Sequence, residues 1–412
     1  MQKTWRPVVL FVLGSLLLAT AVLGQADAAW VGRMDAMAAT LARVSPLLVE
    51  RGPWTPAQEA EVRASMATLR GVAHSLSAGG AKGFPDQDPT LPLLARELAQ
   101  ALDDTQHSTG SQLKGDARLV VATCIGCHTR ADLLGSKGPS VTLPPVQVKE
   151  PWLKADVLLA TRRFSEARVA YNAVVADEVF AAENHYLWER AVKRALVLEV
   201  RTASDPKGAK ALVDQVINMP GSESLARDAV VWQRDIATWL AEQQDADVVP
   251  GADADAAAVA ASQNALFARA DALMQQAMAV ALAPADSSSD VVYLRATAML
   301  HRLLARPVDA DRKARALSHL AVAYEALREV DVWSLYLVYN EACIEAAPHT
   351  AIAAACFERL QRTLFVENTG SAGGPLPKRE QDRLDRLKPL AKVTARAKKP
   401  SSKKATPAPT TP

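Results

Sequence analysis

The sequence predicts an all-α protein, and three observations carry that prediction. Hydrophobic residues make up 49% of the 412 residues, whereas aromatic residues account for only 5% and glycines number 19. Apolar residues recur at three- and four-residue steps along most of the chain, which is the period of a helix with one buried face. The chain is also long enough for two or three domains that each bury a core. We therefore expect a four-helix bundle followed by an α-solenoid of helical hairpins.

Residues 1–28 have the pattern of an export signal. Basic Lys3 and Arg6 precede an apolar run over residues 8–23, and the triplet Ala-Asp-Ala at 26–28 is the small-x-small pattern that signal peptidases cut. The run is long for a cleaved signal and short for a spanning helix, so an uncleaved N-terminal anchor is the alternative. Both interpretations place the rest of the chain in the periplasm or an equivalent exported location.

Residues 29–137 contain four helix-length amphipathic stretches. Each has apolar residues at helical spacing, and proline or glycine residues separate the first three. The second begins at Thr55-Pro56, a capping residue followed by proline at the first helical position. The stretches run from about Val31 to Val44, from Pro56 to Leu76, from near Pro92 to Leu102, and from Asp116 into Cys124.

The fourth stretch ends in Cys124-Ile125-Gly126-Cys127-His128, the C-x-x-C-H pattern of covalent c-type haem attachment. Cysteines three residues apart on one helical face can each bond a vinyl group of the porphyrin, and His128 can then bind the iron. One covalent haem c is therefore the predicted cofactor. A zinc half-site would need further ligands, and a thioredoxin-like redox motif would need a βαβ context, which the pattern lacks.

Residues 30–137, about a quarter of the chain, resemble the cytochrome c prime family, which are exported four-helix bundles with C-x-x-C-H near the end of the last helix. Besides the motif, the resemblance rests on Arg33-x-x-x-Met37, on the Phe84-Pro85 loop and on Leu113-Lys114 before the cysteines. The family usually has an aromatic and a basic residue after the histidine, where this chain has Thr129-Arg130-Ala131-Asp132.

The resemblance implies that His128 is the proximal iron ligand and that Met37 is the distal one. A His/Met pair suits electron transfer, because the thioether raises the reduction potential. The alternatives are Met37 as core filler, Met34 as the ligand, or an open position that binds small gases. His74 and His107 are further candidates, although a single histidine is more often a satisfied or solvated side chain.

Residues 138–151 hold four prolines without a helical period and predict an extended linker. The following residues 152–243 predict helical hairpins. Phe164, Ala167 and Tyr171 resemble the aromatic–small–aromatic pattern of a tetratricopeptide repeat, in which small residues let two helices approach closely. Repeats of this kind bury their apolar faces against their neighbours and present a surface to protein partners.

Residues 258–368 predict a second block of helical repeats, in which Leu317, Leu320, Ala321 and Tyr324 again match first-helix positions of a tetratricopeptide repeat. Cys343 and Cys356 lie at similar distances on either side of a turn near Pro348. On neighbouring antiparallel helices this symmetry can bring the sulfurs into bonding range. A stapling disulfide is therefore predicted, with two buried thiols as the alternative.

Residues 371–412 predict a basic, largely disordered tail, apart from a short charged helix near residues 379–390. The formal net charge of the chain is only +2, and much of the excess basicity lies in this tail. Nucleic acid is therefore not an expected partner. The lysines near the end can contact an acidic partner or an anionic envelope surface, or remain solvated.

These observations predict an exported monohaem c-type cytochrome that uses its haem for electron transfer or redox sensing. The helical repeats are expected to bind a protein partner, and a separate redox partner is implied. The alternative is an envelope repeat scaffold whose haem domain is structural or senses a small gas. No acid–base partner for enzymatic chemistry accompanies the motif, so peroxidase activity is not expected and no catalytic residue is assigned.

Overall fold

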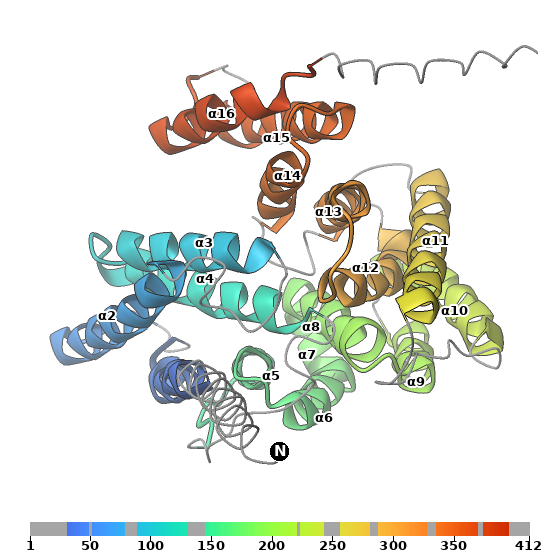
Figure 1. The fold of residues 1–412 in the computed structure, drawn as a ribbon. Coiled ribbons are helices and arrows are strands. Elements are labelled where there is room, and N and C mark those ends of the chain that lie inside the picture. Colours follow the sequence, from blue (N-terminus) through green and yellow to red (C-terminus); the bar gives the residue numbers. More distant parts are fainter. Residues whose placement is uncertain are drawn as a thin grey trace, which may run out of the picture.

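In a computed structural model the chain is helical throughout the part that the structure describes, with no strand there (Figure 1). The predicted all-α class is confirmed. The structure describes residues 31–48, 52–78, 89–130, 145–220, 223–242, 256–280, 287–327, 335–369 and 374–394. The predicted export signal, the first half of the predicted linker (138–144) and the end of the chain lie outside these residues.

The first group of helices leads to the C-x-x-C-H motif. A helix over residues 31–44 continues into η1 (Ser45–Leu48), and α2 (Pro56–Ala78), α3 (Thr90–Asp104) and α4 (Gly110–His128) follow. The start of α2 agrees with the sequence, because Thr55 and Gln58 form a reciprocal capping box: Thr55 N–H donates to Gln58 Oε1 at 2.8 Å, and Gln58 N–H donates to Thr55 Oγ1 at 3.3 Å.

The predicted start of α4 at Asp116 is wrong, since the helix begins six residues earlier at Gly110. The extra turns are mostly polar, with Leu113 as their buried residue, so they show little of the apolar period by which a helix is detected in the sequence. α4 packs against α3 on one side and against the next helix, α5 (Pro151–Ala160), on the other. The motif-bearing helix is therefore in contact with the helices beyond the predicted linker.

The middle of the chain folds into short helices that pack in consecutive pairs, such as α5 with α6 and α9 with α10. Aspartates cap two of them: Asp177 accepts from the Phe180 amide, and Asp205 accepts from the Lys207 and Gly208 amides, with Pro206 at the first helical position. The elements are α6 (Phe164–Val175), α7 (Glu178–Glu183), α8 (His185–Val197), the π-helix η3 (Leu198–Thr202), α9 (Pro206–Ile217) and α10 (Glu223–Glu242).

The last part of the chain begins with a long helix that packs on its successor. The buried turn η5 (Ser287–Ser289) connects these two helices. The indole N–H of Trp232 donates a hydrogen bond to the carbonyl of Ser287 at 2.7 Å. The elements are α11 (Ala256–Val280), η5 (Ser287–Ser289), α12 (Asp290–Leu304), α13 (Ala310–Ala326), α14 (Leu335–Ala346), α15 (Ala351–Thr369) and α16 (Lys378–Ala391). Figure 1 shows α14–α16 stacked above α3 on one side and α13 on the other.

The charged helix predicted near residues 379–390 is present as α16, and it is packed into the fold. Leu387 is fully buried, and Arg379 and Arg383 pair with Glu97 of α3. Arg383 also contacts Glu341 of α14, Nε to Oε2 at 3.3 Å. The sequence shows that this segment is amphipathic, but not that it returns to the helices near the start of the chain.

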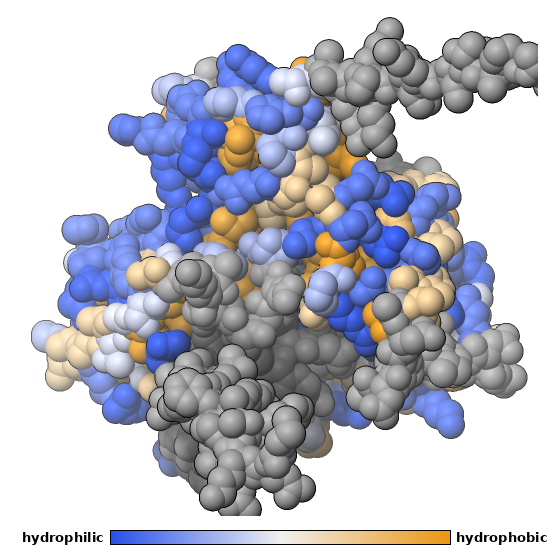
Figure 2. Space-filling view, in the orientation of Figure 1, coloured by the Kyte–Doolittle hydropathy of each residue, from blue (hydrophilic) through white to orange (hydrophobic). Residues whose placement is uncertain are grey.

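Most of the face seen in Figure 2 is hydrophilic, with hydrophobic patches interspersed toward its centre. No helix among the described residues combines the length and the apolar character needed to cross a membrane.

Candidate functional site

The three motif residues lie on the last turn of α4. Cys124 is 6% exposed, whereas Cys127 and His128 are partly exposed, and neither cysteine is in a disulfide. Residues three and four apart share one face of a helix, so the two thiols and the imidazole project from neighbouring positions. The pKa of the Cys124 thiol is raised to about 12, mainly by burial and then by the nearby Cys127. Cys124 is therefore a neutral thiol at pH 7 in the haem-free protein.

The imidazole of His128 is held by a backbone carbonyl from the next helix. Its Nδ1 lies 2.7 Å from the carbonyl oxygen of Ala160, the last residue of α5. Because a carbonyl only accepts, Nδ1 carries the proton, and the lone pair is then on Nε2. Nε2 makes no hydrogen bond to any described residue. This is the arrangement in which a second partner orients a metal-binding histidine.

His128 is held in its neutral form. Its pKa is lowered from 6.5 to about 4, mainly by burial and then by the positive charge of Arg162, while the hydrogen bond to Ala160 acts in the opposite direction. A neutral imidazole with an available Nε2 lone pair is the form that binds iron. The donor set therefore fits a covalently attached haem, with two thiols for the porphyrin and one imidazole for the metal.

The turn after α5 contains Arg162, whose positive charge lowers the pKa of His128. The Arg162 amide donates to the Leu159 carbonyl at 3.0 Å and the Arg163 amide donates to the Leu158 carbonyl at 2.9 Å, which closes the end of the helix. Arg162 itself has φ 60°, in the left-handed region. The end of α5 thus supplies the carbonyl that orients His128.

A buried polar cluster begins one residue after the motif. Arg201 of η3 is fully buried and donates from Nε to the Thr129 carbonyl and from Nη2 to Thr129 Oγ1, both at 2.8 Å. Its guanidinium also lies over the ring of Tyr324, 5.2 Å from the centroid. Arg130 lies 5.8 Å from the ring centroid of Tyr339. The end of α4 is therefore tied to the π-helix and to α13 and α14.

His301 of α12 completes this cluster. Its Nε2 is 2.8 Å from the Tyr324 hydroxyl, and the rings of Tyr324 and Tyr339 are stacked with centroids 4.8 Å apart. His301 is 2% exposed. Burial holds its pKa well below the ordinary value, and the charges of Arg130 and Arg201 lower it further. These residues were not singled out as a site in the sequence, because they come from the segment after α4 and from four further helices, η3, α12, α13 and α14.

The other candidate axial ligands differ in burial and in hydrogen bonding. Met37 is 6% exposed in the apolar core, and Met34 is partly buried against that core. The burial of Met37 does not tell whether its thioether lies near His128. Met37 therefore stays a predicted ligand. His74 contacts Asp103, Nε2 to Oδ1 at 2.9 Å, and His107 is exposed. Within the described residues no group of three or more His, Cys, Asp or Glu side chains could hold a metal ion.

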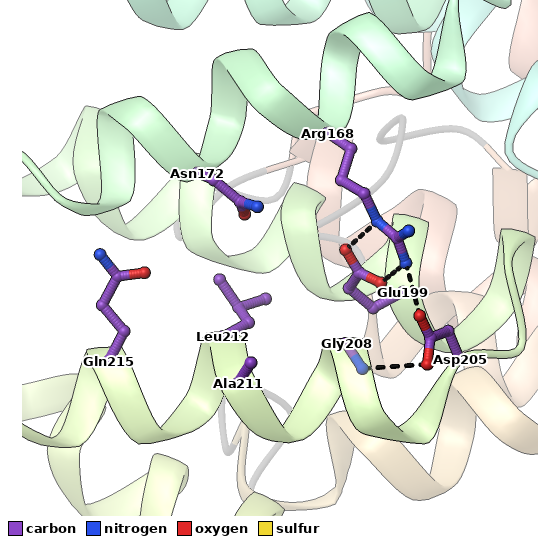
Figure 3. A pocket seen from close by; sticks show the side chains of 8 residues that line it. All are labelled: Arg168, Asn172, Glu199, Asp205, Gly208, Ala211, Leu212 and Gln215. Atoms are coloured by element: carbon purple, nitrogen blue, oxygen red, sulfur yellow. Dashed lines mark hydrogen bonds and ion pairs between the residues drawn. The ribbon is translucent and has the colours of Figure 1, made fainter.

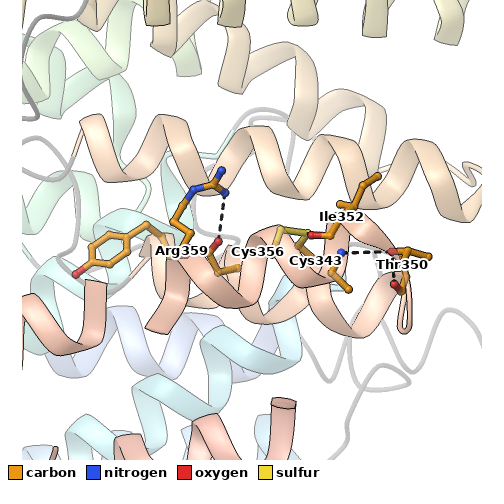
Figure 4. The surroundings of a disulfide bond; sticks show 9 residues. Cys343, Thr350, Ile352, Cys356 and Arg359 are labelled. Atoms are coloured by element: carbon orange, nitrogen blue, oxygen red, sulfur yellow. Dashed lines mark hydrogen bonds between the residues drawn. A yellow bond between two sulfur atoms is a disulfide. The ribbon is translucent and has the colours of Figure 1, made fainter. Parts of the chain in front are cut away.

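Cys343 of α14 and Cys356 of α15 are joined by a disulfide, with Cα atoms 6.4 Å apart (Figure 4). Both cysteines are fully buried. The bond closes the α14–α15 hairpin around its turn.

A polar cleft of about 410 Å³ opens between α6 and α9 (Figure 3). At one end Arg168 pairs with Glu199 of η3, Nε to Oε1 at 2.5 Å, and with Asp205 at 3.0 Å. The three side chains cover Gly208, where an added Cβ would lie 2.3 Å from Glu199 Oε2. A second, more apolar cavity of about 640 Å³ lies between residues 148–158 and α6.

Comparisons with protein-family models, with curated proteins and with solved structures give no match for this chain.

Proposed function

We propose that the protein is an exported monohaem c-type cytochrome, in which a covalently attached haem carries or senses electrons and the helical region binds a protein partner. The proposal rests on one observation: Cys124, Cys127 and His128 share the last turn of α4, and the Ala160 carbonyl orients His128 with its Nε2 lone pair available.

The chemistry of the three residues accounts for the proposed cofactor. Cys124 and Cys127 would hold the porphyrin through thioether bonds, and His128 would be the proximal ligand of its iron. When bound, the haem supplies a one-electron couple. The chain contributes the orientation of His128 and the packed surroundings of Cys124, which restrict access of water to the site.

The helices beyond the motif support the second half of the proposal. α5 with α6, α9 with α10, α11 with α12 and α13 with α14 pack as consecutive pairs, which is the local arrangement expected of repeat hairpins. The polar cleft between α6 and α9 is a place on this region where a protein segment could dock. The partner itself has no signature in the chain.

Haem content tests the proposal. The full-length chain, exported in a bacterium that matures c-type cytochromes, should keep about one haem per molecule after acid–acetone extraction, measured as the pyridine haemochrome. The double variant Cys124→Ser/Cys127→Ser should lose it. Cys343→Ser/Cys356→Ser is the matched control and should keep it, because those sulfurs are bonded to each other. Wild-type protein without covalent haem would refute the proposal.

The optical spectrum of the same protein separates electron transfer from gas sensing, the alternative function. Low-spin haem that becomes high-spin in Met37→Ala would identify Met37 as the distal ligand and favour electron transfer. Met37→Leu keeps the buried volume and so controls for a packing defect. A wild-type ferrous form that is already high-spin and takes up carbon monoxide would instead favour an open, gas-binding position.

A further inference from the structure

The end of α4 is held from two sides by residues that lie far along the chain. On one side the Ala160 carbonyl of α5 accepts the hydrogen bond from His128 Nδ1 at 2.7 Å. On the other side Arg201 of η3 donates from Nε to the Thr129 carbonyl and from Nη2 to Thr129 Oγ1, both at 2.8 Å. Because Thr129 directly follows His128, the two anchors act on adjacent residues.

The bonds from Arg201 meet α4 where the helix has no donors of its own. The last carbonyls of a helix lack a partner within it, and the helix dipole favours a cation there. The Thr129 amide and hydroxyl both donate to the Ile125 carbonyl, at 2.9 Å and 2.8 Å. The Thr129 carbonyl and the lone pairs of its hydroxyl are the acceptors that remain, and one planar guanidinium can bind both at once.

Both anchors belong to one frame of packed helices. α8 packs against α5, which carries Ala160, and against η3, which carries Arg201. The Arg201 guanidinium also lies 5.2 Å from the ring centroid of Tyr324 in α13. Arg201 is 0% exposed, and a buried cation is costly unless several groups bind it. An apolar side chain of similar shape would avoid that cost, but it would lack the two bonds to Thr129.

We propose that Arg201 positions His128 through Thr129. By fixing Thr129, Arg201 holds the last turn of α4 against α5, so that the imidazole keeps its bond to the Ala160 carbonyl and Nε2 stays the unprotonated nitrogen. Without this support the last turn would fray, as helix ends do, and the imidazole would exchange between its two tautomers. The use of the Nε2 lone pair to bind iron rests on the proposed function, whereas the positioning itself does not.

Hydrogen exchange of backbone amides in the haem-free, full-length chain tests the first step. Arg201→Met keeps an unbranched side chain and removes the bonds to Thr129. The amides of Cys127, His128 and Thr129 should then exchange about tenfold faster at pH 7, measured by NMR. Arg201→Lys should give a smaller increase, because an ammonium group can donate to the carbonyl but does not match the fork of the guanidinium.

Arg295 of α12 offers a matched control. It is 4% exposed, its guanidinium lies 5.2 Å from the ring centroid of Trp239, and it pairs with Glu242 of another helix. Arg295→Met therefore removes a comparable buried guanidinium, and should change exchange at the end of α4 by less than about twofold. Equal increases in the two methionine variants would indicate a general loosening of the fold and would overturn the inference.

The tautomer of His128 is a readout that a merely structural role would not move. With isotope-labelled histidine, a two-bond proton–nitrogen correlation spectrum at pH 7 distinguishes Nδ1–H from Nε2–H, and the loss of one signal in His128→Gln assigns it. The wild type and Arg295→Met should show the Nδ1–H form alone. Arg201→Met should lose this single pattern and show both tautomers in exchange.

The outcomes separate this inference from the proposed function. A wild-type protein without covalent haem refutes the proposed function, and the exchange and tautomer measurements still decide the role of Arg201. Wild-type exchange at the end of α4 in folded Arg201→Met overturns the inference, and so does a wild-type tautomer pattern in that variant. If Arg201→Met does not fold, Arg201→Lys carries the test, and wild-type exchange rates in it overturn the inference in the same way.

Discussion

The chain has two pairs of cysteines, and they are arranged in opposite ways. Cys124 and Cys127 lie one turn apart on a single helix, and neither is in a disulfide. Cys343 and Cys356 lie on two antiparallel helices and are bonded to each other. Thiols on one helical face point outward together toward a third group, whereas thiols on facing helices point toward each other. Helix geometry therefore gives Cys343 and Cys356 a structural role, whereas Cys124 and Cys127 are the pair that we propose for cofactor attachment.

The largest expected difference between the two cysteine pairs is in how much their substitution lowers the free energy of unfolding. It joins residues 13 positions apart, and a loop of this length stabilises the folded state by about 3 kcal/mol. Urea unfolding of haem-free Cys343→Ser/Cys356→Ser should show that loss. Cys127→Ser, at the partly exposed end of the other pair, should change the free energy of unfolding by less than about 0.5 kcal/mol. Equal losses in the two variants would contradict the assignment.

The buried cluster that contains His301, Arg130 and Arg201 should make the stability of the protein depend on pH. The pKa of His301 is held well below 6.5 in the folded chain, first by burial and then by Arg130 and Arg201. As the pH falls below 6.5 the unfolded chain takes up a proton at this residue and the folded chain does not. The contribution of His301 to the free energy of unfolding is therefore fully present above pH 6.5. It is lost as the pH falls below that value, by about 1.4 kcal/mol per pH unit.

Urea unfolding at pH 7 and pH 5.5 measures this dependence. His301→Gln keeps a group that can hydrogen-bond to Tyr324 but cannot titrate in this range. The difference in unfolding free energy between the two pH values should be smaller in this variant than in the wild type. The contributions of His128 and His319, whose pKa values are also lowered, are common to both proteins and cancel. The same pH difference in both proteins would show that His301 is protonated in the folded state.

The smallest expected effect is the difference in stability between substitutions at two equivalent threonines, one after α4 and one after α5. Thr129 and Thr161 are both buried residues just after a helix, and each hydroxyl donates to the carbonyl four residues earlier at 2.8 Å. Only Thr129 Oγ1 also accepts from Arg201. Thr129→Val should therefore cost about 1.5 kcal/mol and Thr161→Val less than half as much, in urea unfolding at pH 7. Equal costs would mean that Arg201 contributes nothing through this hydroxyl.

The features that were predictable from the sequence are those whose determinants lie close together along the chain. The C-x-x-C-H motif spans five residues, and the start of α2 is encoded by Thr55, Pro56 and Gln58. The disulfide could be predicted because Cys343 and Cys356 flank a single turn. The structure contains this disulfide, whereas the haem and its ligands remain predictions.

The surroundings of the motif were not predictable in this way. The group that orients His128 is the backbone carbonyl of Ala160. Every residue has such a carbonyl, so the sequence does not show which one will bind. Arg201 reaches Thr129 from 72 residues away, through a π-helix that no residue pattern announces. The partners of α16, Glu97 and Glu341, likewise come from helices far along the chain.

The π-helix η3 has a consequence for how this chain tolerates changes in length. In a π-helix each amide donates to the carbonyl five residues back, where an α-helix uses the carbonyl four residues back, and the Ala203 amide donates to the Leu198 carbonyl in this way. Because the wide turn absorbs its extra residue, deleting one residue from 198–202 and returning to α-helical geometry would leave the chain on either side in nearly the same rotational phase. What the deletion would change is the turn itself, in which Glu199 reaches Arg168 and Arg201 reaches Thr129. Without Val200 the two side chains would be sequence neighbours, and at least one of them would lose its partner.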